Sequence, residues 1–179
     1  TAVNVTSNDG AAFAIDTDDS TDTAAAGGIN WTGATITATG IAVTFDAAGN
    51  GTDADGDVGI PAGMSAGAAP SSVTVSGRQL TIPGIVTDSA GGGSISITTD
   101  ATGDDPPGMD ITLTGYLASE TGGDNTAGDI TITSGGTNDV MDLAPSAGVT
   151  ISATGSADGI VQIDVIVQDS GSDDSLTIS

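Results

Sequence analysis

The sequence predicts an all-β protein, an antiparallel β-sandwich of the jelly-roll or Ig-like type with about 10 to 12 short strands. Three observations lead to this prediction. Gly, Ser, Thr, Asp and β-branched residues dominate the 179 residues, while the helix formers Glu, Lys and Gln are nearly absent. Runs that alternate apolar and polar residues recur at intervals of about 10 to 15 residues. The chain has only two Phe, one Trp and one Tyr, so Ile, Val, Leu and Ala have to build the core.

The expected strands are short runs with one apolar and one polar face. Residues 94–98 and 129–133 each alternate Ile with small polar residues, which is typical of an antiparallel sheet with one wet face. Residues 160–168 are longer and more apolar, so we expect them to form a central strand. In order, the expected strands are residues 2–6, 11–16, 34–39, 41–46, 72–75, 78–82, 94–99, 110–118, 129–133, 149–153, 160–168 and 175–178.

The segments between these runs read as turns and loops of a single domain. Ser76-Gly77 is expected to be the turn of a short hairpin, and Pro106-Pro107 to lie in a loop. Residues 61–70 are either a covering loop or one helical turn. We find no repeat of fixed period, which argues against a β-solenoid or a propeller. We therefore expect residues 1–10 to be a donor strand with its exit segment, and residues 11–179 to be one sandwich domain.

The charge of the chain limits its partners. There are 24 acidic residues and a single basic one, Arg78, which gives a formal net charge of −23. Such a surface repels nucleic acid and anionic lipid, so we expect no nucleic-acid partner. No apolar run approaches the roughly 18 residues that a membrane span needs, so we expect no membrane insertion. Because the chain starts with Thr1 rather than Met, we expect an extracellular or cell-surface protein whose signal peptide has been removed.

The residue inventory argues against an enzyme. The chain has no His, Cys or Lys, so the usual general bases and nucleophilic pairs cannot be assembled. Asp169-Ser170-Gly171 matches the short signature of aspartic proteases, but that chemistry needs two such loops and no second one is present. A polar turn is the simpler interpretation of this tripeptide. Arg78 is most simply a surface residue.

The strongest site signal is an acidic stretch, "DAAGNGTDADGDVG", at residues 46–59. Closely spaced short carboxylates with glycine between them can fold several oxygens around Ca²⁺, which takes six to eight oxygen ligands. The predicted metal ligands are Asp46, Asn50, Asp53, Asp55 and Asp57. An EF-hand is excluded because position 64 is Met and no flanking helices are expected. The alternative is a solvated acidic turn.

Two other patterns have weaker functional interpretations. The acidic clusters at residues 16–22 and 104–110 are expected to be solvated loops. Thr-x-Thr pairs, which could bind ice if they lay in ranks on a flat sheet, occur at Thr35/Thr37, Thr112/Thr114 and Thr131/Thr133. A wet sheet face produces the same pattern, and no repeat aligns the pairs.

Both ends of the chain read as strands. A sandwich with a spare strand has an open edge, and a neighbouring copy can fill it by donor-strand complementation. The predicted partner strand is Ala2, Val3, Asn4, Val5 and Thr6. Repeated head to tail, such donation builds a homopolymer, and calcium would neutralise the charge between copies. The alternative is that both terminal strands pair within their own chain.

Residues 71–103, "SSVTVSGRQLTIPGIVTDSAGGGSISITTDATG", resemble segments of secreted prokaryotic surface proteins and extracellular filament proteins of the donor-strand type. The resemblance implies a structural role. The sequence thus predicts a structural subunit of an extracellular filament, tube or surface layer, assembled by donor-strand complementation and stabilised by calcium. The alternatives are a calcium-dependent module that binds glycans or surfaces, marked by an exposed aromatic residue, and a virion structural protein.

Overall fold

The chain folds almost entirely into short strands. The computed structural model describes residues 4–6, 12–17, 27–31, 35–38, 40–48, 56–60, 70–87, 93–99, 111–115, 117–119, 126–134, 140–143, 149–155, 158–168 and 176–179. Within these ranges there are strands β1 to β18 and no helix, which confirms that the described part of the protein is all-β.

The strands form three sheets and one separate pair. Sheet I contains, from one edge to the other, β2 (Phe13–Asp16), β5 (Ala42–Asp46), β7 (Ser72–Gly77), β10 (Ile95–Thr99), β13 (Ile130–Thr133) and β16 (Val161–Asp164). Sheet II contains β3 (Ile29–Asn30), β6 (Val58–Gly59), β8 (Leu80–Ile82), β11 (Ile111–Leu113), β14 (Val140–Leu143) and β17 (Ile166–Gln168). Sheet III contains β9 (Ile85–Val86), β12 (Leu117–Ala118), β15 (Val149–Ser152) and β18 (Leu176–Ile178), and β1 (Asn4–Thr6) pairs with β4 (Thr35–Thr37).

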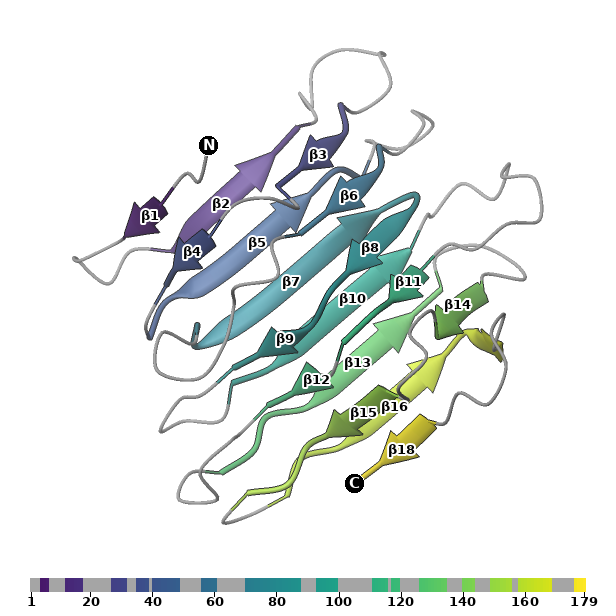
Figure 1. Ribbon diagram of the computed structural model, residues 1–179. Helices are drawn as coiled ribbons and strands as arrows, with labels where there is room; N and C mark the ends of the chain where they lie inside the picture. The colour runs from purple at the N-terminus through teal and green to yellow at the C-terminus, as the bar shows by residue number, and fades with distance from the viewer. Residues whose placement is uncertain are drawn as a thin grey trace.

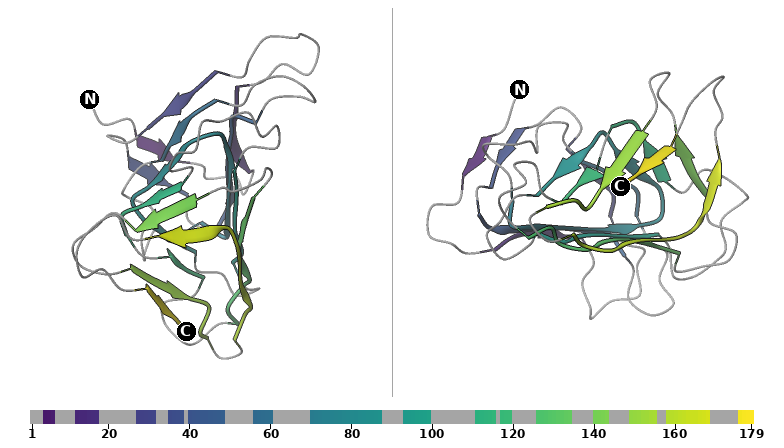
Figure 2. Two further views of the ribbon diagram at one scale, coloured as in Figure 1. Left: turned by 90° about the vertical axis from the view of Figure 1, so that its right-hand side faces the viewer. Right: turned by 90° about the horizontal axis from the view of Figure 1, so that it is seen from below.

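Strand pairing is parallel throughout, so the predicted antiparallel sandwich is wrong. From β7 onward the chain passes from sheet I to sheet II to sheet III and then returns to sheet I one strand further along. This winding is a parallel β-solenoid with six coils, one for each strand of sheet I. Figure 1 shows sheet I as the rear layer, with the shorter strands of sheets II and III in front of it, and Figure 2 shows the space between the layers.

The coils differ in length, which is why the sequence shows no fixed period. In sheet I the successive partners are Phe13, Val43, Val73, Ile95, Ile130 and Val161, separated by 30, 30, 22, 35 and 31 residues. The paired strands hold their register while the connections between them vary. Rejecting a solenoid for lack of a fixed period was therefore an error, because register in a sheet depends on the strands and not on the length of the connections.

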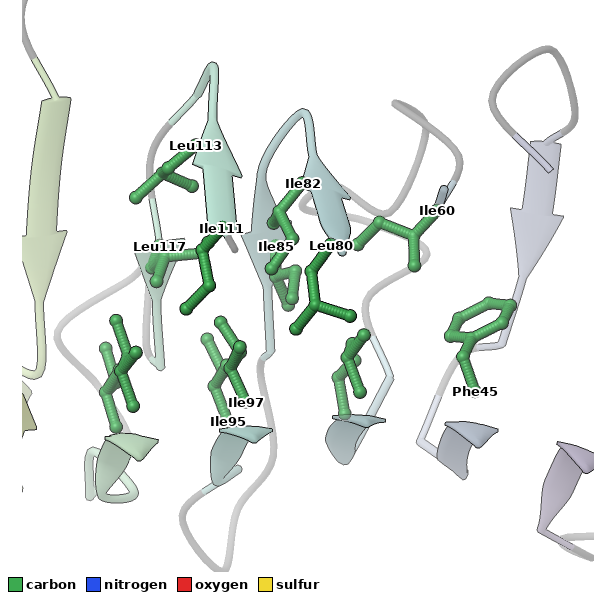
Figure 3. Close-up of a cluster of buried hydrophobic side chains, with 14 of the residues drawn as sticks. Phe45, Ile60, Leu80, Ile82, Ile85, Ile95, Ile97, Ile111, Leu113 and Leu117 are labelled. Carbon is green, nitrogen blue, oxygen red and sulfur yellow. The ribbon is translucent and has the colours of Figure 1, made fainter. Parts of the chain in front are cut away.

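The core lies inside the coils. Val75, Ile97 and Ile132 are fully buried and stack in register in sheet I. Figure 3 shows Ile95 and Ile97 directed from sheet I toward the side chains of the opposite layer. Burying each such side chain contributes about 1.5–3 kcal/mol. The predicted alternation of buried and wet positions is confirmed in β10 and β13, but the buried side faces the interior of a coil.

Glycines allow the coils to approach closely where the chain returns to sheet I. A Cβ atom on Gly159 would meet the carbonyl oxygen of Gly128, and one on Gly128 would meet that of Gly93. A Cβ on Gly93 would lie 2.6 Å from the carbonyl oxygen of Ser71. The backbones of successive coils therefore touch along this column, and only glycine fits there.

Two predicted local features are wrong for the same reason. Ser76-Gly77 is not a hairpin turn, because β7 and β8 belong to different sheets and the chain turns a corner between them. Residues 160–168 form two strands, β16 and β17, which meet at Val165. They lie at the end of the solenoid rather than at its centre. Alternation shows which side chains point inward, but it does not show where a coil bends.

Candidate functional site

The predicted calcium loop connects β5 to β6, and the structure describes its two ends, residues 46–48 and 56–59. Its base is closed by the Gly56 N–H, which donates to the Ala47 carbonyl at 2.7 Å, and by the Ala47 N–H, which donates to Ser76 at 2.9 Å. The Asp46 carboxylate accepts hydrogen bonds from the Ser76 hydroxyl at 2.7 Å and the Ala48 N–H at 3.1 Å. Asp46 therefore already serves the structure of the turn.

Asp57 lies on the other side of this base and pairs with Arg78. The Asp57 carboxylate accepts hydrogen bonds from Arg78 Nη2 at 2.7 Å and Nε at 3.0 Å. The exposed fractions of the two side chains are 39% for Arg78 and 52% for Asp57, so solvent screens the pair and its contribution is about 0–1 kcal/mol. The expectation that Arg78 is a surface residue agrees with this position.

The rest of the predicted calcium site is outside the described residues. Asn50, Asp53 and Asp55 fall there, as does the tripeptide 169–171. Among the described residues, no three Asp, Glu, His or Cys side chains gather in a way that would hold a metal ion. Calcium binding by Asp46, Asn50, Asp53, Asp55 and Asp57 therefore stays a prediction.

An open hollow of about 400 Å³ lies on the outer face of sheet II. Gly59, which has no side chain, lies between its strand neighbours Asn30 and Thr81 in this region. The hollow is lined by Gly28, Ile29, Asn30, Asp57, Val58, Gly59, Gln79 and Thr81. Asp57 is the one ionisable group of this lining and is paired with Arg78. The polar side chains of the lining, Asn30, Gln79 and Thr81, can offer hydrogen bonds to a small polar molecule.

The outer face of sheet I carries aligned hydroxyl groups, which we call the hydroxyl face. Successive strands place Thr44, Thr74, Ser96 and Thr131 in one column, and Ser76, Thr98 and Thr133 in a second. Thr98 and Thr133 share a hydrogen bond of 3.2 Å between their hydroxyl oxygens. Of the Thr-x-Thr pairs noted in the sequence, Thr131/Thr133 lies on this face, whereas Thr35/Thr37 forms β4 and Thr112 lies in β11 of sheet II, so the register does not align the three pairs with one another.

Among the described residues, the partly buried apolar side chains that pack against the core lie at the two ends of the solenoid. The partly buried ones that pack against the core are Phe13, Ile15 and Trp31 at one end and Val161, Ile163, Val165 and Leu176 at the other. The large apolar side chains that are exposed among the described residues are Ile160 (67%), Val167 (39%) and Ile178 (54%). All three belong to the last coil, and Val167 and Ile178 continue inner columns whose preceding members, Met141 and Ile151, are fully buried.

Of the two aromatic residues considered for a glycan-binding module, Trp31 is the one that the structure describes. The Trp31 ring packs with its centroid 6.0 Å from that of Phe13 and 6.5 Å from that of Phe45. With these contacts Trp31 is partly buried and packs against the core of the first coils. Tyr116, the other aromatic residue considered for this role, lies outside the described residues.

The predicted donor strand pairs within its own chain. The described part of the segment, Asn4, Val5 and Thr6, forms β1 and pairs with Thr35, Ile36 and Thr37. At the other end of the chain, β18 pairs with β15. Ala2 and Val3 lie outside the described residues. The pairing corresponds to the alternative in which both terminal strands are internal, so the structure offers no support for donation of this strand.

Comparisons with protein-family models, characterised proteins and solved structures find no match to this chain. Among the residues that the structure describes, no helical segment has the length and apolar character that a bilayer crossing demands.

The exposed apolar ends were not predicted from the sequence, although the residues of the last coil form a recognisable apolar pattern. Residues 160–168 are a strongly apolar run that forms β16 and β17, which are edge strands of sheets I and II in the described structure.

Proposed function

We propose that this protein is a structural element of an extracellular filament, tube or surface layer, and that copies add end to end by stacking coil on coil. The observation that carries the proposal is the location of the incompletely buried apolar side chains at the two ends of the solenoid. The two edge strands of sheet I, β2 and β16, also present backbone N–H and C=O groups with which a further parallel strand can pair. A contact between unlike ends does not close on itself, so it produces a linear polymer.

Stacking replaces donor-strand complementation as the assembly route. The net charge of −23 opposes the approach of two copies, and salt screens such repulsion within a Debye length of about 8–10 Å at physiological ionic strength. The proposal therefore expects assembly to increase with salt. Calcium remains the proposed neutralising ion, with the loop of Asp46, Asn50, Asp53, Asp55 and Asp57 as its proposed site.

The test is the mass and shape of the purified chain across a salt series, by light scattering and negative-stain microscopy. We expect monomers at low salt and elongated polymers at high salt or with calcium. A double variant, Val167→Ser with Ile178→Ser, should assemble less because it removes apolar surface from the end of the last coil. Ile160→Ser is the matched control, because Ile160 is exposed on the outer face of the same coil. A chain that stays monomeric in every condition would contradict the proposal.

Calcium has its own test. Calcium should raise the melting temperature of the chain, and a chelator should lower it, if the acidic loop binds the ion. Replacing Asp53 and Asp55 together by Asn should remove the response. Coincident melting curves with calcium and with chelator would refute the calcium site while leaving coil stacking intact.

The hydroxyl face favours a second candidate function, binding to an ordered and uncharged hydrogen-bonding surface such as ice. Its columns repeat at the strand spacing of about 4.8 Å, so hydroxyl groups recur at equal intervals across the sheet. The test is inhibition of ice recrystallisation by the purified chain. Thr74→Tyr and Thr131→Tyr should abolish it by breaking the flat array, and equal activity of these variants and the parent would exclude the face.

A further inference from the structure

We infer that copies join head to tail with β16 of one copy paired with β2 of the next, and that β1 has to leave its place before this junction can form. The inference rests on the proposed function and specifies its partner, its register and its control. The partner is a second copy of this chain, because the contact continues the coil-to-coil interface that already builds the fold.

The columns of side chains that point into the coils, one residue from each strand, determine the register of the junction. One column of sheet I runs from Phe13 to Val161 and the next from Ile15 to Ile163. Adding the first coil of a second copy beyond the last coil in the same direction places Val161 against Phe13 and Ile163 against Ile15. All four side chains are half-buried in the single chain, and each would gain an apolar neighbour.

Sheet II supports the same register. Its inner column begins at Ile29 and ends at Val167, so the continued ladder places the exposed Val167 against Ile29. Two like ends can meet only with their strands antiparallel, which would break the parallel ladder seen in the sheets. The head-to-tail arrangement is therefore the one that continues the existing interface.

The strand β1 occupies space that this junction needs. In each coil from β7 onward a strand of sheet III follows sheet II and leads back to sheet I, and β4 has the same place before β5. Figure 1 shows β1, β4, β9, β12, β15 and β18 in one row along the front layer, and the view from below in Figure 2 agrees. Because β1 precedes β2, it lies one coil beyond the first coil. A preceding copy would bring its own β18 to that position.

Of the two competing strands, β1 is the weaker. It pairs only with β4, through three residues, in a sheet of two strands, and such isolated pairs are marginally stable in water. By contrast, β18 is the edge of a four-stranded sheet and packs the half-buried Leu176 against the core. We therefore assign β1 the role of a displaceable cap, which shields the first coil until a second copy replaces it.

Charge gives the junction its dependence on salt. At one edge of sheet I, Asp16 pairs with Asp46. At the other edge of the sheet, Asp164 pairs with Thr133 and is the last member of the same column. The junction places Asp164 of one copy opposite Asp16 of the next. Like charges directly opposite each other destabilise strand pairing, so the junction should form only where salt screens them.

The register is tested by disulfide formation in a chain that has no natural cysteine. The outer positions Ala14 and Gln162 oppose each other across the proposed junction, and adjacent strands bring Cα atoms within the reach of a disulfide. The full-length double variant Ala14→Cys/Gln162→Cys should give a ladder of cross-linked multimers at high salt, reversible by reductant. Cross-linked dimers from either single variant would overturn the head-to-tail order. An equal ladder from Ala14→Cys/Asp164→Cys, two residues out of register, would overturn the register.

The cap is tested in the same double-cysteine background. Deleting residues 1–8, or replacing Val5 by Pro to remove a ladder N–H, should speed the growth of the cross-linked ladder several-fold. Val5→Ile keeps the strand and should behave as the parent. Slower growth after the deletion would overturn the cap and favour strand donation. If uncross-linked chains stay monomeric in all salts, the proposed function fails; if they polymerise without the Ala14–Gln162 cross-link, only this inference fails.

Discussion

The fifth and sixth coils place similar side chains at equivalent positions but bury them differently. Ile132 is fully buried, while its partner in the next coil, Ile163, is only half-buried. Likewise Ile151 is buried and its partner Ile178 is 54% exposed. The difference is the presence of a further coil. In this solenoid an apolar side chain is buried mainly by the coils on either side of it, so the sixth coil is incomplete in a way that the fifth is not.

The first coil differs again from the last. Phe13 and Trp31 lie at that end, where the Trp31 ring packs in a tilted arrangement with Phe13 and edge-on with Phe45 of the second coil. Large rings cover more of an open end than aliphatic side chains do. Among the described residues the large exposed apolar side chains accordingly belong to the last coil, so the two ends are chemically unlike.

The largest expected loss of stability follows from substitutions in the glycine column, and its size should differ between an interior coil and the last coil. Gly128→Ala should destabilise the chain by about 3 kcal/mol or more, because its Cβ would meet the Gly93 carbonyl while Gly159 holds the coil from the other side. Gly159→Ala should cost clearly less, since the last coil can shift outward. Urea unfolding of both variants measures the difference. Equal losses would show that the last coil is held as tightly as the interior.

Truncation of paired isoleucines tests burial directly. Ile132→Ala should cost about 2–5 kcal/mol because it leaves a cavity between two coils, whereas Ile163→Ala should cost about 1 kcal/mol. Denaturant midpoints at low salt, where the proposed polymer is absent, give the monomer values. At high salt the cost of Ile163→Ala should rise if a second copy covers that position. A constant value would argue against stacking.

Removing either of two buried hydroxyl groups should change the stability by a smaller amount, and the two changes should have opposite signs. Thr87 Oγ1 donates to the Gly93 carbonyl at 2.9 Å, while the hydroxyl of Ser119, at the equivalent position in the next coil, is buried with no hydrogen-bond partner among the described residues. Thr87→Val should therefore destabilise by about 1 kcal/mol, and Ser119→Ala should be neutral or stabilise by up to about 1 kcal/mol. Thermal melts of both variants measure these two changes in stability. Destabilisation by Ser119→Ala would mean that its hydroxyl is satisfied in solution.

The smallest expected effect is at the surface ion pair. Arg78→Gln should change the free energy of unfolding by less than about 1 kcal/mol, because both partners are exposed and screened. The change should shrink further between low and high salt. Denaturant curves at two salt concentrations check it, and a loss much larger than this would mean that Arg78 stabilises the base of the acidic loop through more than the Asp57 pair.

Several strands were predictable from alternation, but their partners were not. Residues 72–75, 94–99 and 129–133 were each predicted as strands with one buried face, and β7, β10 and β13 confirm it. The two-residue strands β3, β6 and β9 were missed because so short a run shows no alternation. One signal did exist: similar five-residue runs begin at Ala42, Ser72, Ser94 and Asp129, and Gly93 and Gly128 each precede one. Aligning the runs without requiring equal spacing would have indicated stacked coils.

The candidate sites also differ in whether the sequence alone could predict them. The acidic loop was visible in the sequence because its aspartates are neighbours along the chain. The hydroxyl face and the apolar ends were not, because their members come from different coils and meet only through the register.

By itself the sequence determined that this protein is built of short strands, which side chains of the longest ones point inward, and that its surface is strongly acidic. These properties are local, since they follow from composition and from alternation along a few residues. The tertiary structure alone decided that the strands are parallel, that they wind into coils, and that two unlike ends remain incompletely covered. Alternating side chains satisfy a parallel and an antiparallel ladder equally well, so the choice lies in contacts between residues some 22 to 35 positions apart.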